Sequence, residues 1–378
     1  MFRLTSAAVA AAALAGFAGF ATPAFASTAT TQSFGAHRAV FVETDNVNGN
    51  QVVAYHRAAD GTLSQVATYP TGGLGGILTG SVVDHTASQG SLNYDPEHNL
   101  LLAVNAGSNT VSVFAVRGDA LSLRQVVSSG GTFPVSVTVH GDLVYVLNAL
   151  NGGSVQGYRV FGSFLAPIPG SSRALGLDPA ATPQFTHTPG QVAFTPDGSQ
   201  LVVTTKANGN DIDVFDVGFG GRLSTTPSVN AEPGAVPFAI TFDRYGNLVI
   251  ANAGTNSVTT FAITGDGTLS TLDSAATGQA ATCWVASAGR FLFASNAGSG
   301  SETGLTSSAS GQLTLLGNAA TDAGTVDASA AADGRFLYVQ TGGAGIVDEY
   351  SVGSTGSLTK VGSVTVPDAV GGEGIVAF

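Results

Sequence analysis

Two histidines in this sequence lie close to acidic residues, in a pattern that suggests acid–base chemistry. Asp84 directly precedes His85, and Asp178 lies a short distance before His187. A histidine beside a carboxylate can act as a general base, because its pKa lies near neutral pH. His187, His85 and Asp84 are therefore the candidate catalytic residues. The alternative is that they are ordinary loop residues, since a sequence alone does not place two side chains within hydrogen-bonding distance.

A second group of polar residues has the chemistry to bind a substrate. Arg173 and Lys206 are the cations expected on the same face of the fold as the two histidines. Asn252 and Asn296 recur where apolar runs end, and Glu232 lies in a loop expected on that face. We take these five residues as candidate substrate-binding groups. For the two asparagines the alternative is turn chemistry, because Asn tolerates a left-handed backbone and bonds its own main chain.

Four acidic residues near the C-terminus have the chemistry of a metal site: Asp322, Asp327, Asp368 and Glu373. They fall in two consecutive predicted loops. Calcium and magnesium are bound in proteins by carboxylate, carbonyl and water oxygens. We therefore expect a weak Ca²⁺ or Mg²⁺ site there, and no cofactor that is strictly required. The alternative is a solvated acidic rim that keeps the protein soluble and repels phosphates.

The composition limits the classes of function. The 378 residues include 25 Asp and Glu against 13 Lys and Arg, which gives a formal net charge of −12. Nucleic-acid binding needs clustered Lys and Arg, so this acidity argues against a nucleic-acid partner. The single cysteine, Cys283, excludes an intrachain disulfide, a cysteine-based zinc site and an iron–sulfur cluster. Hydrophobic residues make up 44% of the chain, which is enough for a buried core.

The N-terminal residues are typical of an export signal. Arg3 precedes an apolar run over Ala7–Phe20, and Ala24-Phe25-Ala26 matches the rule for signal cleavage. The apolar run is too short to span a membrane well, and no later segment is long and apolar enough. The protein should therefore be secreted or extracellular, with no membrane span once the signal is removed. The expected organisation is a cleaved signal over 1–26, a flexible segment over 27–36 and a folded domain over 37–378.

A short pattern repeats along the rest of the chain. An apolar run ends again and again at a polar residue, as in LLAVN, VYVLN, LVIAN and LFASN. A second run follows, such as TVSVF or DIDVF, and then a Gly-x-Leu-Ser/Thr phrase such as GTLS or GRLS. Short runs rich in β-branched residues and separated by Asp-Gly turns are typical of strands joined by hairpins. Each unit of about 45 residues therefore holds four strands, as a β-propeller blade does.

Seven such units predict an all-β fold, a closed seven-bladed β-propeller of four-stranded antiparallel blades. The first unit lacks an innermost strand before His37, and GIVAF at 374–378 matches GQVAF at 190–194. The C-terminal strand should therefore complete the first blade and close the ring. We call the face on which the innermost strands begin the mouth. Two mouth loops, at 70–90 and 162–189, are longer than the others, and function tends to reside on long loops of a rigid scaffold.

The repeated phrases resemble those of the lactonase family of seven-bladed propellers over residues 37–378. They include VAFTPDGSQLVVTT, LLLAVNAGSNTVSVFAV and LVIANAGTNSVTTFAITGDGTLS. The family includes 6-phosphogluconolactonase and the carboxymuconate-lactonising enzymes, so the resemblance implies a lactone hydrolase or isomerase. The family tends to carry His-Pro-His-Gln where this chain has 188–191 (TPGQ). It also tends to place Glu or Arg after the second strand of later blades, where this chain has Ala253 and Ala297.

Two functions are compatible with these residues. The first is hydrolysis or isomerisation of a lactone other than 6-phosphogluconolactone, and the resemblance favours it. The second is non-catalytic binding of a small molecule, or of a glycan or protein at the cell surface or outside the cell, and the altered motif positions favour that. We expect a monomer in either case.

The export signal gives a first testable prediction. Protein recovered from the culture medium of the producing cell should begin at Ser27, because the cleavage motif ends at Ala26. N-terminal sequencing or intact mass spectrometry measures this directly. Recovery of the exported chain with residues 1–26 still attached would contradict it.

Overall fold

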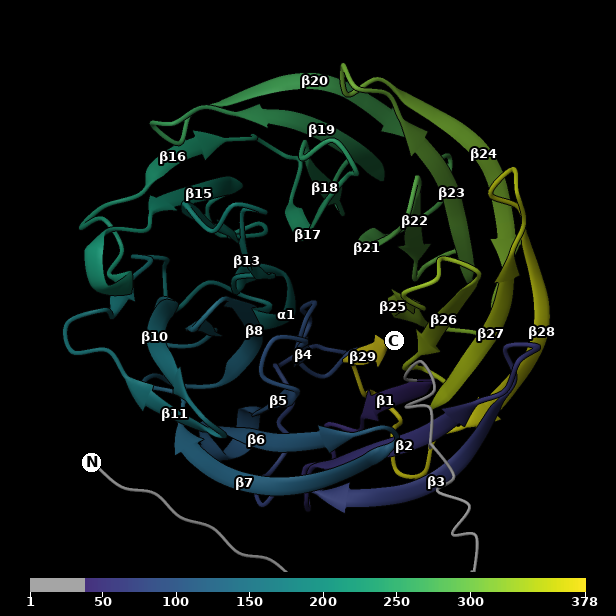
Figure 1. The fold of residues 1–378 in the computed structure, drawn as a ribbon. Coiled ribbons are helices and arrows are strands. Elements are labelled where there is room, and N and C mark those ends of the chain that lie inside the picture. Colours follow the sequence, from purple (N-terminus) through teal and green to yellow (C-terminus); the bar gives the residue numbers. More distant parts are fainter. Residues whose placement is uncertain (1–37) are drawn as a thin grey trace, which may run out of the picture. The chain divides into compact units, whose positions relative to one another are not determined.

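The computed structural model describes residues 38–378, which form seven antiparallel sheets around a common axis (Figure 1). Six sheets have four strands, and the sheet that contains β8 to β11 (residues 134–167) has β12 (Arg173–Ala174) as a short fifth strand. The predicted signal over 1–26 and the segment over 27–36 lie outside the described residues. The prediction of an all-β, seven-bladed propeller is confirmed.

The first four blades are built, from the axis outward, as follows. Blade 1 contains β29 (Ile375–Ala377), β1 (Ala39–Glu43), β2 (Gln51–Arg57) and β3 (Leu63–Pro70). Blade 2 contains β4 (Leu92–Asp95), β5 (Leu100–Asn105), β6 (Thr110–Arg117) and β7 (Ala120–Ser128). Blade 3 contains β8 (Pro134–His140), β9 (Leu143–Asn148), β10 (Ser154–Phe161) and β11 (Phe164–Pro167), with β12 (Arg173–Ala174) beside β10. Blade 4 contains β13 (Val192–Phe194), β14 (Gln200–Thr204), β15 (Asp211–Asp216) and β16 (Ser228–Ala231).

The other three blades follow the same plan. Blade 5 contains β17 (Pro237–Phe242), β18 (Leu248–Asn252), β19 (Ser257–Ile263) and β20 (Leu269–Ala276). Blade 6 contains β21 (Thr282–Ala288), β22 (Phe291–Asn296), β23 (Ser301–Ser307) and β24 (Leu313–Ala320). Blade 7 contains β25 (Thr325–Ala330), β26 (Phe336–Thr341), β27 (Ile346–Val352) and β28 (Leu358–Thr365). The short helices are α1 (Gln184–His187), η1 (Ala106–Ser108) and η2 (Phe219–Gly221).

The burial of each strand follows from its place in the blade. Every residue of the second strands β5 and β26 is buried, because both faces of these strands pack against neighbouring blades. The outermost strand β24 is mostly exposed, since only its inner side has a partner. This explains why the second strands have the most continuous apolar runs in the sequence.

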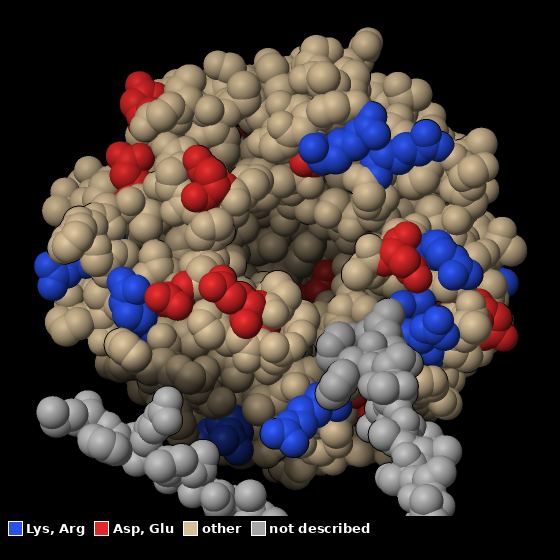
Figure 2. Space-filling model, viewed as in Figure 1, with Lys and Arg blue, Asp and Glu red and all other residues tan. Residues whose placement is uncertain are grey.

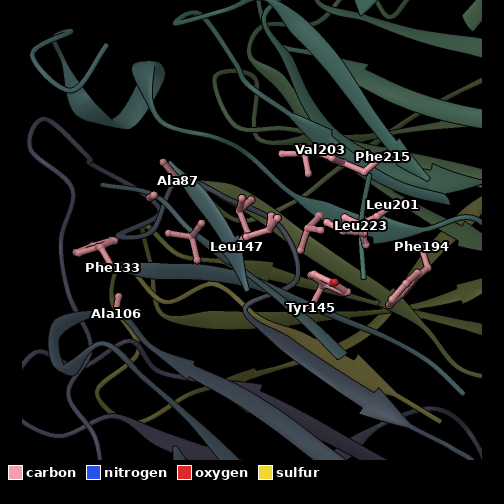
Figure 3. Close-up of a cluster of buried hydrophobic side chains, with 14 of the residues drawn as sticks. Ala87, Ala106, Phe133, Tyr145, Leu147, Phe194, Leu201, Val203, Phe215 and Leu223 are labelled. Carbon is pink, nitrogen blue, oxygen red and sulfur yellow. The ribbon is translucent and has the colours of Figure 1, made fainter. Parts of the chain in front are cut away.

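The largest apolar cluster lies between blades 3 and 4 and is drawn in Figure 3. Tyr145 and Leu147 of β9 pack there against Phe194, Leu201 and Phe215 of blade 4, and all five are buried. The Tyr145 and Phe194 rings meet edge to face, with their centroids 5.9 Å apart. Each blade therefore buries its face against its neighbour, and no blade has a complete core of its own.

The glycine of the Gly-x-Leu phrase is required by contacts between blades. Gly61 has φ +93°, and a Cβ added there would lie 2.2 Å from the Phe336 ring of blade 7. The Tyr338 hydroxyl donates a hydrogen bond to the Gly61 carbonyl oxygen at 2.8 Å. Tyr145 makes the same kind of bond to the carbonyl oxygen of Gly221, at 2.7 Å. The repeated phrase thus marks the points where one blade receives an aromatic residue of another.

The two ends of the domain close the ring. β29 pairs antiparallel with β1, and Phe41 lies opposite Val376. The Glu43 amide donates to the Gly374 carbonyl oxygen at 2.8 Å, and the Phe378 ring stacks on Tyr94 at 4.3 Å between centroids. The prediction that the C-terminal strand completes the first blade is confirmed.

The two long segments differ from each other. Residues 71–91 form a loop between β3 and β4, as expected. The segment 162–189, predicted as one loop, instead contains the outer strands β11 and β12 and the helix α1. That prediction was wrong because the fourth strand of blade 3 is short and lacks the alternating pattern of the other outer strands. Among residues 38–378, none of the helices has the length and hydropathy that a membrane crossing needs.

Ring closure predicts the effect of a C-terminal truncation. Deleting 375–378 removes the β29–β1 pairing and buried apolar contacts, so we expect the free energy of unfolding to fall by more than about 4 kcal/mol. Urea unfolding followed by circular dichroism measures it. Val370→Ser is the matched control in the same terminal segment, because Val370 is 63% exposed. A truncated chain as stable as the control would contradict the closing role of β29.

Candidate functional site

The loop over 71–91 crosses the axial channel at the mouth. The Gln89 side-chain amide donates to the Val285 carbonyl oxygen at 2.9 Å and accepts from the Val285 amide at 3.0 Å. The Trp284 indole donates to the Ser88 carbonyl oxygen at 2.6 Å. Val285 and Trp284 belong to β21 in blade 6, whereas the loop leads into β4 in blade 2. The loop is therefore held by a blade that is not its neighbour in the ring.

Asp84 fixes the shape of this loop. Its Oδ1 accepts hydrogen bonds from the Thr86 and Ala87 amides, each at 2.8 Å, and its Oδ2 accepts from the Ser88 amide at 2.9 Å. Burial raises the pKa of the Asp84 carboxyl to about 6, although these hydrogen bonds and the nearby Lys206 oppose the shift. Asp84 thus has a fixed position and a pKa close to neutral pH.

Lys206 lies beside this loop and is fully buried. It follows β14 with φ 52°, and its Nζ donates to the Ala87 carbonyl oxygen at 2.5 Å and to the Phe185 carbonyl oxygen at 2.7 Å. The Nζ also lies 5.1 Å from the centre of the Phe238 ring. Burial lowers the pKa of Lys206 to about 7, against the attraction of Asp84. Lys206 and Asp84 are therefore two buried groups whose charges attract each other, although no salt bridge joins them among residues 38–378. We call them the Lys206–Asp84 pair.

This pair lies on the wall of a mouth pocket of about 180 Å³. Apart from the pair, the pocket is lined mainly by apolar side chains, including Val236, Phe238, Ala253, Trp284 and Ala297. Ala253 and Ala297 are the positions at which the resembling family tends to carry Glu or Arg. Cys283 also lines the pocket, and burial raises the pKa of its thiol to about 12, so it is not a ready nucleophile.

Neither candidate histidine lines the mouth pocket. His85 packs against the Gly371 backbone, its Nδ1 is buried without a hydrogen-bond partner, and burial lowers its pKa. Asp84 precedes His85 in sequence, but the Asp84 carboxylate accepts hydrogen bonds from the main-chain amides of residues 86–88. His187 closes α1, where its Nδ1 is 2.8 Å from Thr186 Oγ1. It shares a separate, small pocket with Asp178. The structure therefore brings Asp84 to the mouth pocket and leaves His85 and His187 outside it.

Of the predicted substrate-binding residues, only Lys206 reaches the mouth pocket. The Arg173 guanidinium donates only to main-chain oxygens, and its Nε lies 2.7 Å from the Ser224 carbonyl oxygen. Arg173 therefore joins its own segment to the one around Ser224. Asn252 donates to Thr259 Oγ1 and Asn296 to Thr303 Oγ1, each at 2.9 Å. Their amides join the second strand of a blade to the third.

Glu232 is the last of the predicted substrate-binding residues. It is half-buried, and burial raises the pKa of its carboxyl. Its amide donates to the Asn210 carbonyl oxygen at 2.7 Å, which fixes the loop that enters blade 5. Glu232 is not among the residues that line the mouth pocket.

Only two of the four predicted metal ligands lie together. Asp322 lies 3.1 Å from the Lys360 ammonium, and Asp368 is exposed. Asp327 and Glu373 are buried and interact through their side chains. Among residues 38–378 no group of three or more His, Cys, Asp or Glu side chains is arranged to hold a metal ion. The four acids therefore do not converge, and metal binding at the mouth stays a prediction.

Part of the expected acidic rim is instead an internal cluster of carboxyl groups. Glu43, Asp45, Asp327 and Glu373 are all buried. The Glu373 amide donates to Asp45 Oδ2 at 2.9 Å, and Glu373 Oε1 accepts from the Gly90 amide at 2.8 Å. Burial raises the pKa of Glu43, Asp45 and Glu373 well above their ordinary values and that of Asp327 to about 7.

Figure 2 shows an acidic side chain inside the central hollow, and further acidic as well as basic side chains on the face around it. The sequence did not reveal this burial, because an acid in a predicted loop normally faces water. A usable signal was the phrase DHTAS at 84–88, whose Asp, Thr and Ser can bond one another in a tight turn.

The buried cluster predicts that Glu373→Gln changes the dependence of stability on pH. A carboxyl whose pKa is raised by folding stabilises the folded state at low pH, and this contribution is lost as pH rises through the folded pKa. The variant cannot ionise, so relative to the wild type it should gain roughly 1 kcal/mol or more between pH 5 and pH 8.

Chemical unfolding at pH 5 and pH 8 measures this difference, with the exposed Glu97→Gln as control. A gap between variant and wild type that stays constant with pH would contradict the buried, protonated cluster. The same measurement with added calcium tests the metal prediction, because an ion that binds the folded state raises its stability.

Comparison with known proteins places this geometry in a family. Residues 187–373 match the family model described as Lactonase, 7-bladed beta-propeller. No curated protein matches the sequence. Many solved structures share the fold, as three examples show.

The first is a protein of Bacteroides fragilis provisionally assigned as a 6-phosphogluconolactonase. It is 19% identical, with a TM-score of 0.70 over 91% of this chain and 98% of that chain. The second is the periplasmic gluconolactonase of Pseudomonas aeruginosa, which is also 19% identical, with a TM-score of 0.70 over 89% of this chain and 98% of that chain. The third is the virginiamycin B lyase of Staphylococcus aureus, which is 14% identical, with a TM-score of 0.55 over 78% of this chain and 90% of that chain. At these identities the likeness shows the fold alone. Together with the family match over 187–373, it identifies this chain as a seven-bladed β-propeller of the lactonase family.

Proposed function

We propose that the mouth pocket binds a small, uncharged lactone with few hydroxyl groups and opens it by hydrolysis. The observation that carries this proposal is the buried Lys206–Asp84 pair on the wall of an otherwise apolar pocket. The fold family supports lactone chemistry, since the solved relatives include a gluconolactonase. Secretion and a monomeric state stay predictions beside this one.

The size of the pocket favours a single ring. Its volume is about 180 Å³, and a dry cavity of about 150 Å³ in another protein is known to hold benzene. A five- or six-membered lactone with a short alkyl group has this size. The lining of Phe238, Trp284 and alanines offers such a ring dispersion contacts and no partners for several hydroxyl groups.

The charge of the pocket disfavours a phosphorylated substrate. Lys206 already donates to two carbonyl oxygens, and Asp84 adds a negative charge beside it. A phosphate dianion would lose its hydration there without a free cation in exchange. Ala253 and Ala297 supply no guanidinium or carboxylate at the positions where the family tends to have one.

The pair can divide the chemistry of ring opening between its two members. The Lys206 ammonium donates to the lactone carbonyl oxygen and stabilises the negative charge that develops on it. Asp84 takes a proton from the attacking water, whose oxygen forms the new bond to the carbonyl carbon. The ring C–O bond then breaks, and the leaving oxygen receives that proton. The product is a hydroxy acid, with one water consumed.

A second function, non-catalytic binding, is favoured by a specific observation. Both members of the pair have hydrogen-bond partners within the protein: two carbonyl oxygens for Lys206 and three amides for Asp84. A pair fully engaged in this way would shape the pocket without taking part in a reaction. The same lactones would then bind without being consumed.

A panel of lactones tests the proposal. We expect δ-valerolactone or δ-hexalactone to be hydrolysed faster than glucono-δ-lactone, and 6-phosphoglucono-δ-lactone negligibly. Lys206→Met should lower kcat/KM by about 100-fold, because it removes the donor to the developing oxyanion. Lys360→Met is the matched control, since Lys360 is far more exposed and lies outside the pocket.

The pH profile gives an independent readout. Turnover needs ionised Asp84 and protonated Lys206, so it should rise as pH passes about 6 and fall as pH passes about 7. Heat release on lactone binding without turnover would support the binding function instead. Turnover of the phosphorylated lactone above about 1 s⁻¹ would contradict the proposed substrate class.

A further inference from the structure

Three exposed phenylalanines lie on two neighbouring blades. Phe161 and Phe164 flank the tip of the β10–β11 hairpin in blade 3, and they are 60% and 51% exposed. Phe219 lies in η2, between β15 and β16 in blade 4, and its exposure is 104%. These connections follow the third strands, so they lie on the face opposite the mouth. Full exposure of a phenylalanine is costly in water, so three of them together call for an explanation.

Arginines line the clefts on both sides of the β10–β11 hairpin. On the blade 2 side, a cleft of about 420 Å³ is lined by Arg117, Arg124 and Ser163. On the blade 4 side, a cleft of about 400 Å³ is lined by Arg159 and Arg222 together with Phe161 and Phe219. The hairpin joins the two clefts into one surface. The Phe–Arg surface is defined by Phe161, Phe164, Phe219, Arg117, Arg124, Arg159 and Arg222.

The positive charge of this surface is only partly neutralised. Arg159 lies 3.7 Å from Asp142, and Arg222 donates to the Pro169 carbonyl oxygen at 3.1 Å. Within residues 38–378, Arg117 and Arg124 form no ion pair with a carboxylate. Asp119, in the turn that follows Arg117, lies 3.3 Å from His56. Two guanidinium groups therefore remain available for an external anion.

We propose that the Phe–Arg surface docks on a membrane surface rich in anionic lipid. Exposed aromatic tips enter the boundary between headgroups and acyl chains, and arginines beside them bind lipid phosphates. The shape favours a lipid over a protein partner, because Phe219 projects fully into solvent from a glycine-rich turn. A protein partner would need a preformed pocket for it, whereas fluid acyl chains do not.

This orientation is compatible with a working mouth pocket. The pocket is built by loops that enter the innermost strands, whereas the Phe–Arg surface is built by hairpins after the third strands. Docking through the Phe–Arg surface would leave the mouth facing away from the membrane. The inference is thus independent of the proposed function, and either can fail without the other.

Co-sedimentation with vesicles tests the proposal. Wild-type protein should bind vesicles of phosphatidylcholine mixed with phosphatidylglycerol, and bind pure phosphatidylcholine far more weakly. Phe219→Ser combined with Phe161→Ser should weaken binding to the mixed vesicles by roughly tenfold or more. Arg117→Gln with Arg124→Gln should weaken it too and reduce its sensitivity to salt. Val82→Ser is the control, because Val82 is 81% exposed but lies at the mouth.

Insertion can be measured separately with Phe219→Trp. The chain has one native tryptophan, Trp284, which is buried at the mouth pocket, so a change in emission on adding mixed vesicles reports position 219. A blue shift, with quenching by brominated lipid, supports docking. The proposal is overturned if vesicles are not bound, or if the serine variants bind as the wild type does. Binding to soluble polyglutamate that matches the vesicle binding would also overturn it, in favour of a protein-binding surface.

Discussion

The pairing of β29 with β1 is the interaction on which the rest of this molecule depends. Each blade buries its faces against two neighbours, so a ring opened at one junction would expose two apolar faces to water. The chain avoids this by sending its last strand, Ile375–Ala377, back to the innermost position of its first blade. The stacking of Phe378 on Tyr94 carries the contact on into blade 2. The Ala377 amide donates to Ser329 Oγ of blade 7 at 3.0 Å, so closure links three blades at the junction.

The closed ring also makes the mouth possible. A loop that leaves blade 1 can bond to blade 6 only because the ring holds both at a fixed distance across the channel. Gln89 and Ser88 use that distance to reach Val285 and Trp284. The same loop is folded on itself by Asp84, and its Ala87 carbonyl oxygen receives the Lys206 ammonium. A buried amine is thus placed in an apolar pocket partly by this loop, through Ala87, and partly by Phe185 in the segment that enters blade 4.

The fold could be predicted from the sequence because its signals are local and repeated. Runs such as LVIAN at 248–252 indicate a strand that is buried on both faces. The Gly-x-Leu phrase recurs in five of the seven blades. The matching ends at 190–194 and 374–378 were enough to predict closure. The segment after Phe161 was predicted less well, since its outer strand is short and irregular.

The site could be predicted only in part, because it depends on contacts between distant segments. Asp84 and Lys206 were recognised as chemically capable, but no local pattern indicated that both would be buried near each other. The acids at Asp327 and Glu373 were expected at a solvated rim and instead lie inside, since the loop over 71–91 covers them. His85 and His187 have suitable chemistry, but their side chains lie outside the pocket.

The mouth site depends on Lys206, a buried amine with a lowered pKa on the wall of the pocket. NMR of protein labelled at lysine Nζ and Cε tests it directly, because the chain contains only two lysines, Lys206 and Lys360. Lys206 should titrate near pH 7 and its resonances should shift when δ-valerolactone is added. Lys360 should titrate above its ordinary pKa and show no response to the lactone. Titration of Lys206 near 10.5, or no response of Lys206 to any lactone of the panel, would contradict a buried Lys206 amine in a lactone-binding pocket.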